Sequence, residues 1–360
     1  MNITGSTQRK TALEQWFISL LPELSENSDS KITKTLRPIS GDASFRRYFL
    51  GHIDGKPYVL VDAPPETEDN QAFVAIARAF QEAGLNVPEV YAVDYEQGFM
   101  CISWLGKTLL LERLKKLEDS PFEAGYIYQQ ALDDLLIIQK VPTRDGLLLP
   151  RFDRTLYSYE FELFTEWFCS GLMRVDLNAS DLSLLDYFFQ TLIESAMSQP
   201  QVCVHRDYHS RNLVYNQQNK LGILDFQDAV IGPVTYDLVS LLKDCYIAWP
   251  RREVTRWALN FASKAQDAGI ISNLDEQQFL RDFDLMGVQR HLKAIGIFSR
   301  LYLRDSKPGY LADIPRCLVY IKEVVSDDPD MFELAHWLEK RIYPTVFNRL
   351  KNSGQRAVIS

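Results

Sequence analysis

Residues 202–226 constrain this chain more than any other part of the sequence. Two β-rich runs in this stretch, 213–215 and 221–224, are joined by a polar turn with a glycine close by, which predicts a hairpin. Because a hairpin brings its two ends together, Asn212 before the first run would lie beside Asp225 after the second. An amide oxygen and a carboxylate would then face each other at the open end of the hairpin.

The side chains around this hairpin end suit phosphoryl transfer. Mg²⁺ prefers oxygen ligands and takes only one or two from protein when substrate phosphates supply others. Asp207 lies five residues before Asn212 on the same loop, where it could accept a proton from a substrate hydroxyl. The spacing H-x-D-x-x-x-x-N, which begins at His205 and is followed by D-F, is that of kinase-type catalytic loops. We therefore interpret Asp207 as the base and Asn212 and Asp225 as metal ligands. The alternative, a polar loop whose side chains only cap backbone groups, does not require this order.

The rest of the chain divides into two parts of different character. Periodicity in the first hundred residues predicts helices at 10–21 and 70–83 and strands at 35–39, 45–50, 58–62, 89–93 and 99–104. Helical stripes then dominate, at 127–139, 157–173, 181–197, 235–247, 253–268 and 275–303. The predicted fold class is α+β and bilobal, with a small antiparallel-sheet lobe over 1–104 and a large, mainly helical lobe over 105–360. A cleft between two such lobes is a favoured place for a small-molecule site.

Composition narrows the class of partner. The 360 residues carry a net charge of −9, which disfavours binding to a nucleic-acid backbone. The five cysteines are scattered without the close spacing of a zinc or redox motif, so we expect free thiols in a reducing compartment. No apolar run reaches the ~18 residues of a membrane span. The expected location is the cytoplasm, without membrane or nucleic-acid partners, and the oligomeric state stays open.

The stretch from His205 to Phe226, with Gly232-Pro233 and Asp237-Leu238 after it, resembles the aminoglycoside phosphotransferase/choline kinase branch of the protein-kinase-like fold. This resemblance implies ATP and Mg²⁺ as cofactors. It also implies that Asp237 begins a helix and braces the catalytic loop through hydrogen bonds. Two residues that follow the metal aspartate, Gln227 and Asp228, stand where protein kinases have glycine, and they either touch substrate or lie on a surface loop.

The resemblance also places nucleotide contacts in the first lobe. The segment 39–44 looks like the loop that covers the phosphates, so Gly41 and Ser44 are expected to bind them. The segment 102–106 matches the hinge, where the backbone of Ser103 and Leu105 would hold adenine.

One departure from the family pattern concerns the lysine that the third strand normally supplies to the nucleotide phosphates. The corresponding strand at 58–62 contains no lysine and ends in Asp62. We hypothesise that Arg46 or Arg47, on the adjacent strand, supplies the cation. Strand alternation lets only one of the two face the cleft, and the other is expected to be a solvated surface arginine.

Peripheral segments between roughly 35 and 320 resemble the bacterial anomeric kinases of cell-wall sugar salvage, which phosphorylate N-acetylmuramate and N-acetylglucosamine at C1. These segments include 41–48, 62–66 and 287–301. The lactyl carboxylate of muramate asks for a cation. The expected sugar contacts are His205, Arg211, Gln227, Asp228, Arg290, Lys293 and Arg304.

Other interpretations stay open. The basic residues at 290–304 also fit a solvated helix face, and Glu160 on its aromatic-rich helix is more typical of a core position than of a sugar pocket. A kinase of another small molecule (an amino alcohol, a different sugar or an aminoglycoside) has the same motif. A pseudokinase-like binding module is supported only by the missing strand lysine.

Overall fold

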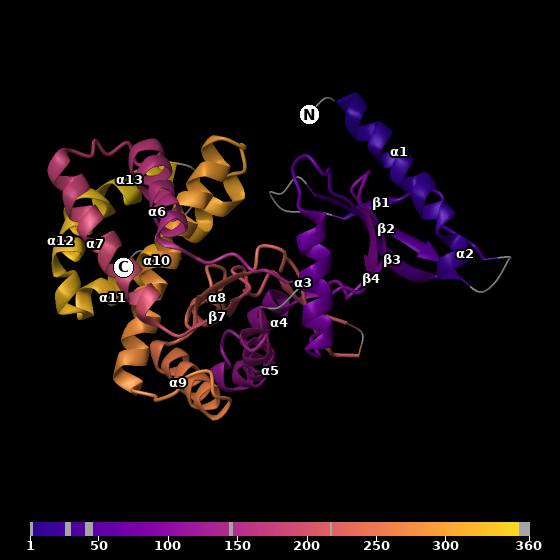
Figure 1. Cartoon of the computed structure of the whole chain (residues 1–360). Coiled ribbons are helices and arrows are strands. Elements are labelled where there is room, and N and C mark those ends of the chain that lie inside the picture. Colours follow the sequence, from indigo (N-terminus) through magenta and orange to yellow (C-terminus); the bar gives the residue numbers. More distant parts are fainter. Residues whose placement is uncertain (1–2, 26–29, 40–45, 144–146, 217, 353–360) are drawn as a thin grey trace. The chain divides into compact units, whose positions relative to one another are not determined.

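The computed structural model describes residues 3–25, 30–39, 46–143, 147–216 and 218–352 (Figure 1). The chain forms two compact units. The first comprises Met1–Thr108, Thr143–Leu148 and Leu213–Gln227; the second comprises Leu109–Pro142, Leu149–Asn212 and Asp228–Ser360. An antiparallel sheet dominates the first unit and helices dominate the second, which confirms the predicted α+β class.

The sheet of the first unit has five antiparallel strands. Their order is β1 (Arg37–Ile39), β2 (Arg47–Ile53), β3 (Lys56–Asp62), β5 (Phe99–Ser103) and β4 (Val90–Asp94). Strands β2 and β3 are joined by Asp54 and Gly55, whose φ angles of 50° and 81° are those of a two-residue hairpin turn.

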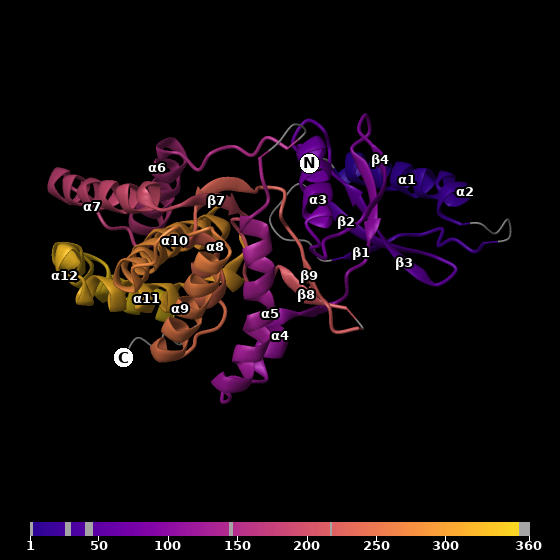
Figure 2. The ribbon, with the colours of Figure 1, turned by 60° about the horizontal axis from the view of Figure 1, so that its bottom comes forward.

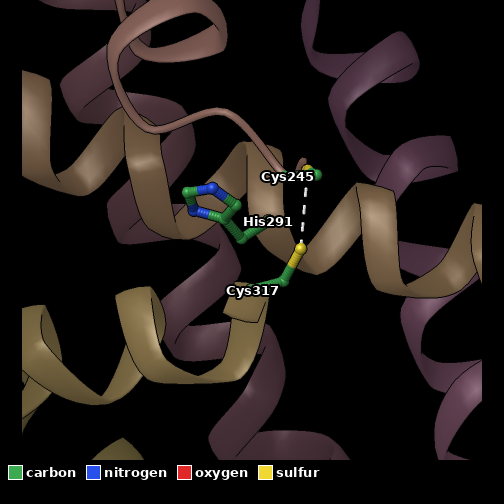
Figure 3. Close-up of side chains that lie close together, drawn as sticks. All are labelled: Cys245, His291 and Cys317. Atoms are coloured by element: carbon green, nitrogen blue, oxygen red, sulfur yellow. Dashed lines mark hydrogen bonds between the residues drawn. The ribbon is translucent and has the colours of Figure 1, made fainter. Parts of the chain in front are cut away.

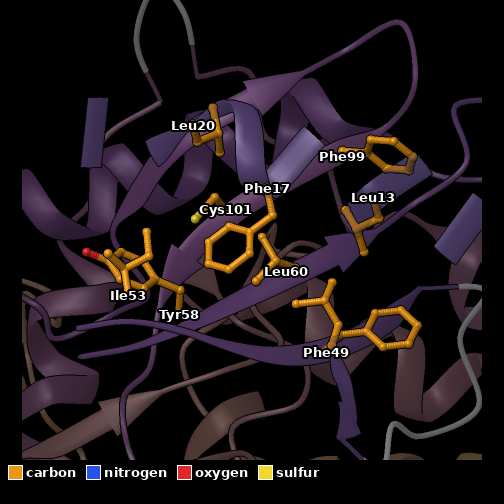
Figure 4. Close-up of a cluster of buried hydrophobic side chains, with 10 residues drawn as sticks. Leu13, Phe17, Leu20, Phe49, Ile53, Tyr58, Leu60, Phe99 and Cys101 are labelled. Carbon is orange, nitrogen blue, oxygen red and sulfur yellow. The ribbon is translucent and has the colours of Figure 1, made fainter. Parts of the chain in front are cut away.

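Helices cover both faces of this sheet. α1 (Ile3–Ser19), followed by the short α2 (Leu21–Leu24), buries Leu13 and Phe17 against strands β2, β3 and β5 (Figure 4). Gly51 is required there, because a Cβ at this position would lie 2.6 Å from the ring of Phe17. α3 (Asn70–Glu82) lies on the other side of the sheet (Figure 1). Asp69 caps α3 by accepting the backbone N–H of Ala72 at 2.9 Å.

The predicted hairpin is present as β8 (Leu213–Tyr215) and β9 (Leu221–Ile223), but it belongs to the first unit. The predicted boundary between residues 104 and 105 assigned this segment to the second lobe, whereas the structure groups it with the first unit. Packing explains the difference. The backbone N–H of Ile223 donates to the carbonyl of Asn86 at 2.9 Å, and the ring of Phe226 lies 5.0 Å from that of Phe73. The short β6 (Thr108–Leu109) pairs with β8.

The second unit is built around one long helix, α10 (Glu276–Leu303), which contacts most of the other helices of this unit (Figure 2). The other helices are α4 (Leu110–Lys115), α5 (Pro121–Gln139), α6 (Arg154–Leu163), α7 (Ala179–Ser198), α8 (Tyr236–Leu242), α9 (Arg251–Asp267), α11 (Ile314–Asp327), α12 (Phe332–Arg341) and α13 (Tyr343–Asn352). Shorter turns are the π-helix η1 (Phe164–Leu172) and the 3₁₀ helices η2 (Pro308–Asp313) and η3 (Pro329–Met331).

A glycine lets α10 approach the π-helix η1 closely. A Cβ on Gly296 would lie 2.5 Å from the backbone of Leu163, so no larger residue fits without a shift of the backbone. Beside this helical assembly, strands β7 (Gln201–Val204) and β10 (Val230–Pro233) pair antiparallel. Among the helices of the described residues, none is both long and apolar enough to cross a membrane.

Candidate active site

Residues 205–212, termed the catalytic loop after the predicted base Asp207, follow strand β7 directly. Asp237 at the start of α8 holds the beginning of this loop. Its carboxylate accepts the backbone N–H of His205 at 2.6 Å and that of Arg206 at 3.0 Å. These are the hydrogen bonds predicted for Asp237. They fix the backbone where Arg206 adopts a left-handed conformation, with φ of 74°.

The catalytic loop is also closed by its own side chains. The backbone N–H of Asp207 donates to Nδ1 of His205 at 3.2 Å, and the side-chain nitrogen of Asn212 donates to the carbonyl of Asp207 at 3.0 Å. His205 is completely buried and orients the loop, so the structure gives it a positioning role instead of the predicted sugar contact. Because the nitrogen of Asn212 faces the loop, its amide oxygen is the atom suited to a metal.

The pKa of Asp207 fits a proton acceptor. Burial by itself would raise the pKa of this carboxyl, but the positive charge of Lys293, with those of Arg290 and Arg206, lowers it below its ordinary value. Asp207 is therefore ionised at neutral pH.

A buried carboxylate on α6 organises the cations near this loop. Oε1 of Glu160 lies 3.0 Å from Arg206 and 2.8 Å from Lys293, and Oε2 accepts a hydrogen bond from Gln289 at 2.9 Å. The hydroxyl of Tyr236 accepts a further hydrogen bond from Lys293 at 2.9 Å. Glu160 is 1% exposed, as the core interpretation expected, but its role is electrostatic. Its partners come from distant parts of the sequence, so no local motif indicated it.

The other cations predicted to bind sugar have different environments. Arg290 is buried, donates to the hydroxyl of Ser240 and to the sulfur of Cys245, and lies inside the helical packing. Arg304 is exposed and paired with Asp305 at 2.8 Å. Both side chains are thus engaged within the protein, and neither is proposed as a sugar ligand. Arg211 lies within the catalytic loop, and its guanidinium carbon is 3.6 Å from the ring centre of Tyr246.

A second connection holds the far end of the catalytic loop. Asp244, which is 1% exposed, accepts the backbone N–H of Ser210 at 3.0 Å with one oxygen. Its other oxygen accepts the backbone N–H of Tyr246, also at 3.0 Å. Asp244 thereby joins the catalytic loop to the segment that follows α8. The sequence offered no signal for it, because Asp244 lies outside the recognised spacing.

Beside this segment, Cys245, His291 and Cys317 gather in the interior (Figure 3). Their potential ligand atoms lie within 4.8 Å of one another, and the two sulfur atoms are 3.4 Å apart. Nη1 of Arg290 already contacts the Cys245 sulfur at 3.5 Å, and a guanidinium there opposes a second cation. One ring nitrogen of His291 is engaged by the carbonyl of Lys243 at 2.8 Å. We interpret this cluster as packing between α10, α11 and the chain after α8.

The predicted second metal ligand, Asp225, lies in the first unit directly after the β8–β9 hairpin. Its φ of 63° is left-handed, which turns the chain sharply after β9. Phe226 fixes this turn by packing on α3, with its ring centre 5.8 Å from that of Phe80. Gln227, predicted as a possible sugar contact, instead donates to the Asp225 carboxylate at 2.8 Å and orients it. Asp228 is exposed.

Arg46, which directly precedes β2, and Arg47, the first residue of β2, point to opposite faces of the sheet. Arg46 lies on the α3 face, where its guanidinium is 3.0 Å from Glu68 and 5.6 Å from the ring centre of Phe73. Tyr48 shares this face. Its desolvation, and after that the charge of Asp225, raise the pKa of Tyr48, and Arg46 opposes this shift through its charge and a hydrogen bond. Arg46 and Asp225 thus lie near the same hydroxyl.

Arg47 lies on the opposite face and forms an ion pair with Asp62, which also accepts a hydrogen bond from Nε of Arg9 at 2.8 Å. The expectation that one of the two is a solvated surface arginine is wrong, because Arg46 is buried and Arg47 is paired with the buried carboxylate of Asp62. Asp62 also does not occupy the place of the missing lysine. On strand β3 the side chain that faces α3 is that of Val61, the register partner of Tyr48.

Of the two other segments predicted to bind the nucleotide, the structure describes one, at residues 102–106. Gly41 and Ser44 lie outside the described residues. At the hinge, Ser103 pairs with Glu89: its backbone N–H donates to the Glu89 carbonyl at 2.8 Å, and its hydroxyl accepts the Glu89 N–H at 2.9 Å. Leu105 is nearly buried and packs on the hairpin, where a Cβ on Gly222 would come within 2.9 Å of it.

Comparison with known proteins gives consistent matches. Residues 35–274 match the model of the phosphotransferase enzyme family. An N-acetylmuramate/N-acetylglucosamine kinase of Pseudomonas aeruginosa is 41% identical over 328 residues, which are 91% of this chain and 95% of that protein. A protein with the same name from Neisseria meningitidis is 36% identical, over 88% of this chain and 91% of its own.

Solved structures with low sequence identity share the fold. An ethanolamine kinase of Plasmodium vivax superposes with a TM-score of 0.57 at 12% identity, covering 84% of this chain and 86% of its own. The choline kinase LicA of Streptococcus pneumoniae superposes with a TM-score of 0.56 at 14% identity, covering 88% of this chain and 99% of its own.

Proposed function

The chain belongs to the phosphotransferase enzyme family, and we propose that it transfers the γ-phosphate of ATP to the anomeric C1 hydroxyl of N-acetylmuramate and N-acetylglucosamine, in cell-wall sugar recycling. The observation that carries the proposal is sequence identity to known kinases. Relatives that are 36% to 42% identical over most of the chain are named for these two sugars. We also place the enzyme in the cytoplasm, where ATP is available and its five buried cysteines stay reduced.

Asp207 is proposed to orient the C1 hydroxyl and take its proton. An anomeric hydroxyl is more acidic than an ordinary alcohol, so the carboxylate that Lys293 keeps ionised is a sufficient base. Three sets of hydrogen bonds preorganise the carboxylate: the Asp207 backbone N–H donates to His205, Asn212 donates to the Asp207 carbonyl, and the loop backbone donates to Asp237. Such positioning supplies much of the rate in phosphoryl transfer.

The proposed metal ligands are Asn212 and Asp225. Both offer oxygen donors, and each is held by a neighbour: Asn212 donates to the Asp207 carbonyl, and Asp225 accepts from Gln227. This donor set fits Mg²⁺, which when bound would neutralise charge on the nucleotide phosphates. Chain connectivity supports the pairing, because these residues bracket the β8–β9 hairpin.

For the nucleotide, we propose that Arg46 replaces the strand lysine. Arg46 is the arginine on the α3 face, and it lies near Tyr48 together with Asp225. Its partner Glu68 lies just before helix α3. In protein kinases the corresponding lysine is likewise paired with a glutamate of a helix. Arg47 is engaged by Asp62 on the other face. The backbone N–H of Ser103 is occupied by the Glu89 carbonyl, so we assign the adenine contact to the residues around Leu105.

The test is a substrate panel with purified protein and MgATP: N-acetylmuramate, N-acetylglucosamine, glucose, choline and kanamycin. The expected result is ADP formation with the two N-acetyl sugars, accompanied by loss of reducing-sugar signal, because a C1 phosphate blocks the reducing end. ADP formation with a product that keeps its reducing end would place the phosphate elsewhere. Turnover of choline or kanamycin alone would assign the enzyme to another substrate class.

A further inference from the structure

Next to Asp207 in the second unit lies an arginine set among aromatic rings. The guanidinium carbon of Arg211 is 3.6 Å from the ring centre of Tyr246 and 5.9 Å from that of Tyr310. Phe298 of α10 stacks on Tyr310 at 5.5 Å between ring centres and lies 6.4 Å from Tyr246. We call these three rings the aromatic platform. Arg211, Tyr246 and Tyr310 are all partly exposed, so a ligand in solvent can reach them.

Arg211 differs from the other cations of this region in what it contacts. Arg206 and Lys293 share the carboxylate of Glu160, and Arg290 donates to Ser240. Within the described residues, Arg211 forms no ion pair and no hydrogen bond. Burial raises the pKa of the nearby Asp313 carboxyl, the charge of Arg211 opposes that shift, and Asp313 is itself paired with Arg316 at 3.6 Å. The N–H donors of Arg211 are therefore available to a ligand, while its planar face is held by the ring of Tyr246.

The aromatic platform is fixed relative to the predicted base. Asp244 accepts the backbone N–H groups of both Ser210 and Tyr246, so the catalytic loop and the platform share one buried carboxylate. The ring of His209 packs edge-on against Tyr246, with 5.4 Å between ring centres. Arg211 is four residues from Asp207 on this loop. A sugar whose C1 hydroxyl reaches Asp207 has its remaining groups within the neighbourhood of the platform.

We propose that Arg211 is the carboxylate-binding residue of the acceptor site and favours N-acetylmuramate over N-acetylglucosamine. This inference rests on the proposed function. The two sugars differ by the lactyl ether of muramate, which carries a carboxylate. A guanidinium binds a carboxylate through two parallel hydrogen bonds, and a guanidinium stacked on a ring loses little freedom when it does so. Of the platform rings, the partly exposed Tyr246 and Tyr310 offer apolar surface to the sugar itself, while Phe298 is buried.

The test compares kcat/KM for the two sugars in wild type and in Arg211→Met, and the readout is the ratio of the two values. The variant is expected to lower the muramate-to-glucosamine ratio roughly 10- to 100-fold, the scale of a lost charged hydrogen-bond pair. Arg211→Lys, which keeps the charge without the planar fork, should lower the ratio by an intermediate factor. The matched control is Arg256→Met on α9, an exposed arginine that also lies over a ring, that of Trp257 at 6.0 Å, and should leave the ratio unchanged.

A substrate change gives the same information without altering the fold. For wild type, kcat/KM for the methyl ester of N-acetylmuramate should be lower than for the free acid by a similar factor. For Arg211→Met, kcat/KM should be the same for the acid and the ester. The inference is wrong if Arg211→Met lowers kcat/KM equally for both sugars, or if wild type has the same kcat/KM for the acid and the ester. In either case the enzyme still phosphorylates both sugars. If wild type phosphorylates neither sugar, the proposed function itself fails.

Discussion

The guanidinium of Arg46 lies 3.0 Å from the carboxylate of Glu68, and burial leaves only 5% and 12% of these two side chains exposed. This pair lies on the α3 face of the sheet, together with Tyr48 and near Asp225. A buried cation with one acidic partner is the arrangement that kinases use to hold nucleotide phosphates. Strand β3 has a lysine only at its first residue, Lys56, but Arg46, directly before β2, supplies a cation to the α3 face.

Substitution of Arg46 should weaken nucleotide use. Arg46→Met removes the proposed phosphate ligand, so we expect the KM for ATP to rise about tenfold or more. Steady-state kinetics with ATP varied at saturating sugar measure this. The exposed Arg78→Met on α3 is the control. Arg47→Met should instead lower the free energy of unfolding, because it leaves the buried Asp62 with one cation fewer. A larger rise in KM for Arg47→Met than for Arg46→Met would reverse the assignment.

Asp207→Asn should remove proton transfer while preserving the loop. The side chain is similar in size, and the loop hydrogen bonds use the backbone of Asp207, so the fold should be retained. We expect kcat to fall by roughly 10²- to 10⁴-fold, the usual effect of losing a general base. ATP affinity, measured by equilibrium binding, should change little. Near-normal turnover would exclude Asp207 as the base.

Asp225→Asn should change the dependence on Mg²⁺. The amide removes the negative charge of a proposed metal ligand, and Gln227 loses its carboxylate acceptor. The concentration of Mg²⁺ that gives half-maximal turnover should therefore rise at fixed ATP. A chelator in excess should abolish turnover of wild type, and added Mg²⁺ should restore it. An unaltered Mg²⁺ titration in the variant would contradict the ligand assignment.

Glu160→Gln should destabilise the second unit. The variant leaves Arg206 and Lys293 without their shared carboxylate in the interior, and breaking a buried charge network in this way costs about 3–5 kcal/mol. Urea unfolding followed by fluorescence measures the change. Glu162→Gln, on the exposed face of the same helix, should shift the free energy of unfolding by less than about 0.5 kcal/mol. Equal effects of the two variants would refute the organising role of Glu160.

His291 should make stability fall in acid. Burial, and after it the charge of Arg290, lower the pKa of His291 to about 3. The unfolded chain binds a proton at this histidine below about pH 6.5 and the folded chain does not, so stability is full above pH 6.5 and decreases toward pH 3.

Between pH 6.5 and 5 this histidine should cost wild type about 2 kcal/mol of unfolding free energy, and His291→Gln should abolish that part of the loss. Urea midpoints at the two pH values test it, with the exposed His336→Gln as control. The prediction fails if wild type and His291→Gln lose stability in parallel.

Local patterns predicted most elements of the chain. The strands from β1 to β5, helix α3 and the β8–β9 hairpin lie close to their predicted positions, because alternation, helical stripes and turn residues are short-range signals. Helix α1 is longer than expected, and α11 to α13 were not predicted. The π-helix η1 was predicted as part of one continuous helix, since its conformation depends on packing with α10 near Gly296.

The sequence by itself determined the proposed catalytic constellation, because the proposed base Asp207 and the proposed metal ligands Asn212 and Asp225 are joined by one short loop and one hairpin whose closure is a local event. Only the tertiary structure decided which charges surround it. Glu160 and Lys293 meet although 133 positions separate them in the sequence. Arg46 and Arg47 are neighbours in the chain, yet the pleat of β2 sends one to Glu68 and the other to Asp62. Ion pairs are selected by proximity in space, and a linear pattern does not encode that proximity.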